Sequence, residues 1–113
     1  MNKSYAFALR VIKLYKYLIG DQKEFVLSKQ ILRSGTAVGA LVKEAEHAQS
    51  KADFINKMNI ALKEANETEY WLMLLRDSDY IDGKSFESIH TDSSELTKLL
   101  AGIVKTSKQN NGK

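Results

Sequence analysis

Apolar residues recur every three or four positions along most of the chain, the spacing that places them on one face of an α-helix. In the first such segment, predicted over residues 4–19, Phe7, Val11, Leu14 and Leu18 follow this spacing. A second apolar line runs beside the first and comprises Tyr5, Leu9, Ile12, Tyr15 and Ile19. The combined apolar face is wide, which predicts a helix that is buried on more than one side.

A second helix is predicted over residues 24–48, although its middle contains Gly35 and Gly39. Each interior glycine costs a helix about 1 kcal/mol relative to alanine, so a break into two helices is the alternative. The two glycines are four residues apart and therefore share a face on which another backbone can approach closely. We predict one continuous helix, because close packing at this face offsets the propensity cost.

Two further helices are predicted over residues 53–76 and 84–106, with Ser50 and Asp53 forming a capping pair at the start of the first. The chain contains no proline to interrupt them. Residues 107–113 are polar and predict a disordered tail. Four helices joined by short turns predict an all-α fold, a single antiparallel up-down-up-down four-helix bundle formed by residues 1–106.

The composition is that of an ordinary globular protein, with 43% hydrophobic and 27% charged residues. The absence of cysteine excludes disulfides and thiolate metal sites, and it is compatible with a reducing cytosol. No apolar run approaches the roughly 20 residues that span a bilayer, and charges interrupt the N-terminal segment. We therefore expect a cytoplasmic protein with neither a membrane association nor an export signal.

The net charge of +3 is mildly basic and permits nucleic-acid binding. The first predicted helix carries Lys3, Arg10, Lys13 and Lys16 and no acidic residue, so its exposed side is a basic strip. In an up-down-up-down bundle, the N-terminal end of the first helix and the C-terminal end of the fourth helix lie at the same end of the bundle. The candidate nucleic-acid-binding residues are therefore Lys3, Arg10, Lys13, Lys16, Lys105 and Lys108. The alternative is that the strip is a solvated face that only keeps the protein soluble.

Two Glu-x-x-His pairs, Glu44 with His47 and Glu87 with His90, resemble the ligand spacing of di-iron four-helix bundles. The first pair lies near the C-terminal end of the second predicted helix, and the second pair lies near the N-terminal end of the fourth. Antiparallel packing therefore places the two pairs at opposite ends of the bundle. The first helix also lacks an acidic ligand. We therefore expect no metal site and no cofactor. No grouping of nucleophile and base is readable, and we expect no catalytic residues and no enzymatic activity.

Several polar residues of the second predicted helix share a side and need partners if they are buried. We expect an ion pair between Arg33 and either Glu64 or Glu67. Such a pair would set the register of two helices more than it would add stability. The candidate structural polar cluster comprises Gln30, Arg33, Ser34, Glu44 and Glu64.

Residues 27–45, which include Leu-Ser-Lys-Gln-Ile-Leu-Arg-Ser-Gly-Thr-Ala-Val-Gly-Ala, resemble the central motif of a four-helix-bundle family. That family was first named for reading frames in intervening sequences of bacterial 23S ribosomal RNA genes. Residues 50–72 resemble the same family. The matching polar positions are Gln30, Arg33, Ser34, Glu44 and Glu64. The sequence departs from the family at Leu41, where asparagine is usual, and at Lys43, where a small residue is common.

The resemblance implies an antiparallel four-helix bundle, often assembled as a homopentamer and without established catalytic activity. It extends to the accessory variability protein of diversity-generating retroelements, which works with a reverse transcriptase and nucleic acid. Our first hypothesis is a non-catalytic homo-oligomeric scaffold that binds RNA or DNA through the basic face of the first helix. From the resemblance we expect the oligomer to be a pentamer. The alternative hypothesis is a protein–protein adaptor with no role in nucleic-acid binding.

Overall fold

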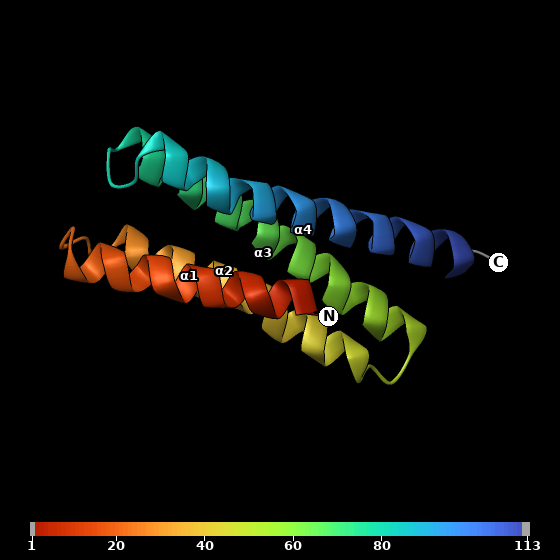
Figure 1. The fold of residues 1–113 in the computed structure, drawn as a ribbon. Helices are drawn as coiled ribbons and strands as arrows, with labels where there is room; N and C mark the ends of the chain where they lie inside the picture. Colours follow the sequence, from red (N-terminus) through yellow and green to blue (C-terminus); the bar gives the residue numbers. More distant parts are fainter. Residues whose placement is uncertain (1, 112–113) are drawn as a thin grey trace.

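Four α-helices make up the computed structural model, which describes residues 2–111. They are α1 (Asn2–Gly20), α2 (Leu27–Glu46), α3 (Lys51–Asp77) and α4 (Gly83–Asn111). Figure 1 shows successive helices running in opposite directions, with the α1–α2 and α3–α4 turns at one end and the α2–α3 turn at the other. The described residues contain no strand, and the predicted all-α antiparallel bundle is confirmed.

Each helix packs against its neighbours in the chain, and α1 also meets α4, so the four helices stand at the corners of a square. The bundle is a rod 51 Å long and 21 Å across. The α1–α4 contact is much the thinnest of the four. Figure 1 also shows α1 starting well short of the end that α4 and the α2–α3 turn reach. The fourth corner of the bundle is therefore open along part of its length.

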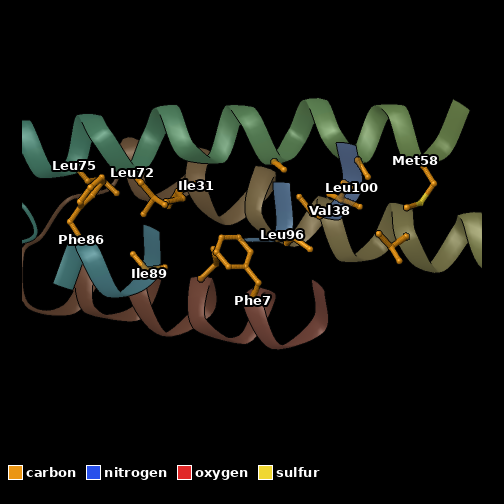
Figure 2. Packing of buried hydrophobic residues seen from close by; sticks show 14 of the residues in the cluster. Phe7, Ile31, Val38, Met58, Leu72, Leu75, Phe86, Ile89, Leu96 and Leu100 are labelled. Atoms are coloured by element: carbon orange, nitrogen blue, oxygen red, sulfur yellow. The ribbon is translucent and has the colours of Figure 1, made fainter. Parts of the chain in front are cut away.

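The core runs along the axis of the rod and takes residues from all four helices. Figure 2 shows Phe7 of α1, Val38 of α2, Leu72 of α3 and Leu96 of α4 directed into this interior. Burying a side chain of this size stabilises the fold by about 1.5–3 kcal/mol. The predicted stripes supply most of these residues, and Leu14, Phe54 and Ile103 pack partly buried against the same core.

Helix α2 is continuous through both of its glycines, as predicted. A Cβ atom at Gly35 would lie 2.7 Å from one methyl carbon of Val11 and 2.8 Å from the other. A Cβ at Gly39 would lie 3.3 Å from the backbone oxygen of Ser4. Both glycines therefore let α1 approach closer than any side chain would allow. This close contact between α1 and α2 explains why the helix tolerates two residues of low propensity.

Helix α2 begins at Leu27, three residues later than predicted, because Glu24 caps it from outside. The Glu24 carboxylate accepts hydrogen bonds from the backbone N–H groups of Ser28 (2.7 Å), Leu27 (3.0 Å) and Val26 (3.2 Å). Val26 holds the N-cap position and has no side chain that can cap. Burial opposes ionisation of Glu24, but the hydrogen bonds from Leu27, Ser28 and Val26 outweigh it and lower its pKa.

We expect Glu24→Gln to lower the free energy of unfolding by about 1 kcal/mol at pH 7, the usual worth of a helix cap. The folded-state pKa lies below the unfolded one, so the stabilisation is full above about pH 4.3 and disappears as the pH falls through the folded-state value. Urea unfolding at pH 7 and at pH 3 should therefore show the gap between wild type and variant shrinking in acid. Asp21→Asn, which removes an exposed carboxylate from the same turn, is the control. A gap that is constant with pH would contradict the assignment.

The other helix ends lie close to their predicted places, with one exception. The Ser50 hydroxyl accepts a hydrogen bond from the backbone N–H of Asp53 at 3.0 Å, so the predicted cap of α3 forms. Helix α4, in contrast, continues to Asn111 and does not stop at Thr106. In the described part of the predicted tail, residues 107–111 are thus helical, because nothing in their sequence breaks a helix that is already formed. Residues 112–113 of that tail lie outside the described residues.

Candidate functional site

The basic residues on α1 divide into two pairs according to the direction they face. Arg10 faces α4, where Nη1 donates to the Asp92 carboxylate at 2.7 Å and to the Ser88 carbonyl oxygen at 3.0 Å. Its Nη2 donates to the Ser88 hydroxyl at 2.9 Å. Lys3 pairs with Glu95 of α4 at 3.5 Å. The charges of Lys3 and Arg10 are therefore partly compensated within the protein, which corrects the expectation of a uniformly free basic strip.

Lys13 and Lys16 face outward from α1, and both are exposed. Within residues 2–111, neither forms an ion pair. They are one turn apart, so their ammonium groups can reach two neighbouring sites on a polyanion. Lys13 and Lys16 are the part of the predicted strip that is free to bind an anion from solution.

Lys105 and Lys108 are exposed on the last turns of α4, away from α1. Glu95, the partner of Lys3, marks where α1 starts alongside α4. Lys105 lies ten residues further along α4, which is about 15 Å at 1.5 Å per residue. The six candidate residues therefore do not form one continuous basic surface.

The predicted ion pair between α2 and α3 is present. Arg33 Nη1 lies 3.2 Å from Glu64 Oε2, and Nη2 bonds Glu67, which also accepts a hydrogen bond from Trp71 Nε1 at 3.1 Å. The hydrogen bond from Arg33 to Glu64 is the main cause that raises the pKa of the guanidinium. Half of the Arg33 side chain is exposed, so the network sets register more than it adds stability.

Ser34 joins this cluster from inside the bundle. Its hydroxyl is fully buried and lies 3.0 Å from the Thr68 hydroxyl, which is also 2.8 Å from the carbonyl oxygen of Glu64. Thr68 is not among the polar residues predicted from the sequence. Thr68 sits at core spacing with a hydroxyl that needs a partner, and that was the available signal.

Gln30 and Glu44, the remaining members of the predicted cluster, lie elsewhere. Gln30 is exposed near the start of α2. Glu44 lies near the far end of the same helix and pairs with Lys57 of α3 at 3.7 Å. The five candidate residues therefore include one true cluster, formed by Arg33, Ser34 and Glu64. Its contacts are structural, because every charged group in it faces an opposite charge.

The histidines lie in different places. His47 caps the C-terminus of α2 and is exposed, while the half-buried His90 stacks on Phe86 in α4 with ring centroids 4.9 Å apart. In the part of the chain that the structure describes, no three His, Asp or Glu side chains gather as metal ligands. Likewise, none of the described helices is long and apolar enough to cross a membrane.

An apolar surface on the outside of α1 and α2 is the other feature open to a partner. On α1, Tyr5 is 69% exposed and Leu9 is 52% exposed. A shallow groove between the two helices begins beside Tyr5 and Ala8 and is bounded by Thr36 and Ala40 of α2. Exposed apolar side chains beside a groove are typical of a contact with another protein chain. We call this surface the α1–α2 face.

Comparisons with known proteins found a matching family and a similar solved structure. The family described as 23S rRNA-intervening sequence protein matches residues 1–102. The crystal structure of a protein of unknown function from the S23 ribosomal protein family of Bacteroides thetaiotaomicron is similar, with 63% sequence identity and a TM-score of 0.91. The similarity covers 92% of this chain and 93% of that chain. No curated protein matches. Neither matching description names a catalytic activity.

Proposed function

The chain belongs to the family of 23S rRNA-intervening sequence proteins, and from that premise we propose that it is a non-catalytic, homo-oligomeric scaffold that binds RNA or DNA through α1. The family description associates its members with a ribosomal RNA insert but assigns no chemistry. Within residues 2–111, no three His, Asp or Glu side chains gather as metal ligands. Electrostatic binding of a polyanion is the activity that best fits the exposed basic residues of α1.

Lys13 and Lys16 carry this proposal. Two exposed cations one turn apart on a helix, without internal partners, lose little by contacting phosphates. Arg10 and Lys3 would first have to leave Asp92 and Glu95, so they contribute less. The net charge of +3 adds a weak general attraction for nucleic acid.

Assembly of several copies would strengthen so small a site. Two lysines neutralise only two phosphates, whereas a ring of subunits presents the same pair several times, and linked contacts multiply in affinity. The α1–α2 face supplies an apolar surface that a second copy could cover, which would bring neighbouring α1 helices together. We propose a homopentamer, as the resemblance to the family implies, and a cytoplasmic location suited to a chain without cysteine.

The test is the salt dependence of binding to fluorescently labelled single-stranded RNA and duplex DNA, measured by anisotropy. We expect the logarithm of the association constant to fall linearly with the logarithm of salt concentration. The slope should be about −0.7 (single strand) or −0.9 (duplex) per phosphate contact, so two contacts on each engaged subunit give at least about −1.4 or −1.8. Native mass spectrometry of the same sample gives the number of subunits in the complex, and the slope can then be expressed per subunit. A flat response to salt would contradict nucleic-acid binding.

The alternative function is a protein–protein adaptor, and the ion pairs to α4 favour it. Asp92 and Glu95 compensate half of the cations on α1, which leaves a surface far less basic than the sequence suggests. In that case the α1–α2 face would bind a different protein. Salt-independent weak binding together with a monomeric mass would support this alternative.

A further inference from the structure

A cleft lies between α1 and α4, where these two helices meet least closely. It has a volume of about 570 Å³, within the range of small-molecule sites. Its floor is apolar and is made by Leu14 of α1, Ile81 of the α3–α4 turn and Ile89 of α4. Ile81 and Ile89 belong to the buried core, so the cleft reaches into the bundle. Figure 2 shows Ile89 on α4 at the side of the bundle where α1 runs.

On the α4 side, Ser85 and Ile89 line the cleft. Ser85 lies one turn before Ile89, on the side of α4 that faces α1, and fills little space. On the α1 side, the larger side chains of Lys13 and Tyr17 stand at i and i+4 spacing. The small Ser85 side chain leaves space beside these two residues.

The polar groups stand only at the rim, and two of them already have partners. Arg10 is held by Asp92 and Ser88 of α4. Asp82 accepts a hydrogen bond from the backbone N–H of Ser85 at 2.7 Å and so caps α4. These contacts leave Arg10 and Asp82 little capacity for a ligand.

Lys13 and Tyr17 are the polar residues of the cleft that can still bind a ligand. Lys13 is exposed and makes no ion pair within residues 2–111. The Tyr17 hydroxyl accepts a hydrogen bond from Gln22 Nε2 at 2.7 Å, which leaves its own proton free to donate. An uncompensated cation and a free donor on one helix face, beside an apolar floor, complement a single anionic group attached to an apolar body.

We propose that this cleft binds a small amphipathic monocarboxylate, with its apolar part on Leu14, Ile81 and Ile89 and its carboxylate between Lys13 and Tyr17. A nucleobase is a poorer fit because the floor offers nothing to pair with its polar edge. The site does not rest on the proposed function, although a carboxylate and a phosphate would compete for Lys13.

The test follows ¹H–¹⁵N NMR spectra of the full chain during titration with decanoate, kept below the concentration at which it forms micelles. We expect saturable shifts at the amides around Leu14, Ile81 and Ile89. 1-Decanol has the same tail without the charge and should bind about threefold more weakly, the size of an exposed charge contact. Lys13→Gln should abolish this preference for decanoate. Lys16→Gln removes the same charge one turn further along α1 without lining the cleft, and it should retain the preference.

A second variant tests the location independently of charge. Ser85 is exposed in the first turn of α4, so Ser85→Leu should fold normally while filling the cleft. We expect it to remove the shifts caused by both probes. Equal affinity for the two probes, equal effects of Lys13→Gln and Lys16→Gln, or shifts centred on the α1–α2 face would each overturn the proposal.

Discussion

Gly35→Ala is expected to lower the free energy of unfolding by about 1–2 kcal/mol, although alanine is the better helix former. The added methyl group would overlap both methyl carbons of Val11, at 2.7 and 2.8 Å. Val11 is fully buried and β-branched, so it has no free rotamer into which it can move. The overlap therefore outweighs the gain of about 1 kcal/mol in helix propensity. Urea unfolding followed by circular dichroism measures the change.

Gly102→Ala is the matched control. Gly102 lies in the interior of α4, and a Cβ there meets nothing within 4 Å. This change should therefore raise stability by up to about 1 kcal/mol. Val11→Ala destabilises the protein by leaving a cavity, but in that background Gly35→Ala should become neutral or stabilising. If Gly35→Ala stabilised the wild type as much as Gly102→Ala does, the proposed close contact between α1 and α2 would be wrong.

Lys13→Glu combined with Lys16→Glu should weaken nucleic-acid binding about tenfold or more and reduce the steepness of the salt slope by about 1.4 (single strand) or 1.8 (duplex) for a single engaged subunit. Both side chains are exposed and have no partner in the described residues, so the double variant should fold with an unchanged melting temperature. Anisotropy titrations at two salt concentrations, with a thermal melt of the same sample, measure both quantities.

The structure also shows why Arg10 is best left unchanged in this experiment. A glutamate at position 10 would face Asp92, and the loss of binding could then reflect damage to the α1–α4 contact. The control is Lys63→Glu with Lys84→Glu, which makes the same change in net charge at exposed positions on α3 and α4. If the control weakened binding as much as the α1 variant, the effect would be one of overall charge, and α1 would not be the interface.

The predictions made from helical spacing were confirmed for contacts within one helix or between two consecutive helices. Arg33 was expected to pair with Glu64 or Glu67, and it pairs with both, because their positions on α2 and α3 leave few other geometries. Ser50 was expected to cap α3, and it does so through contacts within four residues. In both cases the relevant distances depend on local helix geometry and on one pair of helices joined by a short turn.

The predictions were incomplete where the result depended on non-adjacent helices or on the ends of the rod. Nothing in the pattern of α1 indicated that Arg10 meets Asp92, because these residues are 82 positions apart and their approach depends on how far each helix extends. Glu24 was read as the first residue of a helix, yet it caps that helix from outside. The cleft beside Lys13 likewise depends on Ser85 and Ile81 coming opposite α1.

The amino-acid sequence by itself determined four amphipathic helices, their antiparallel order and the presence of cations on α1, since helix periodicity and short turns leave little choice at that level. Only the tertiary structure decided which of those cations remain free. Charge compensation acts over a few ångströms, so it depends on which face of α1 a side chain occupies and on what packs against that face. Lys3 and Arg10 face α4 and reach Glu95 and Asp92, whereas Lys13 and Lys16 face solvent.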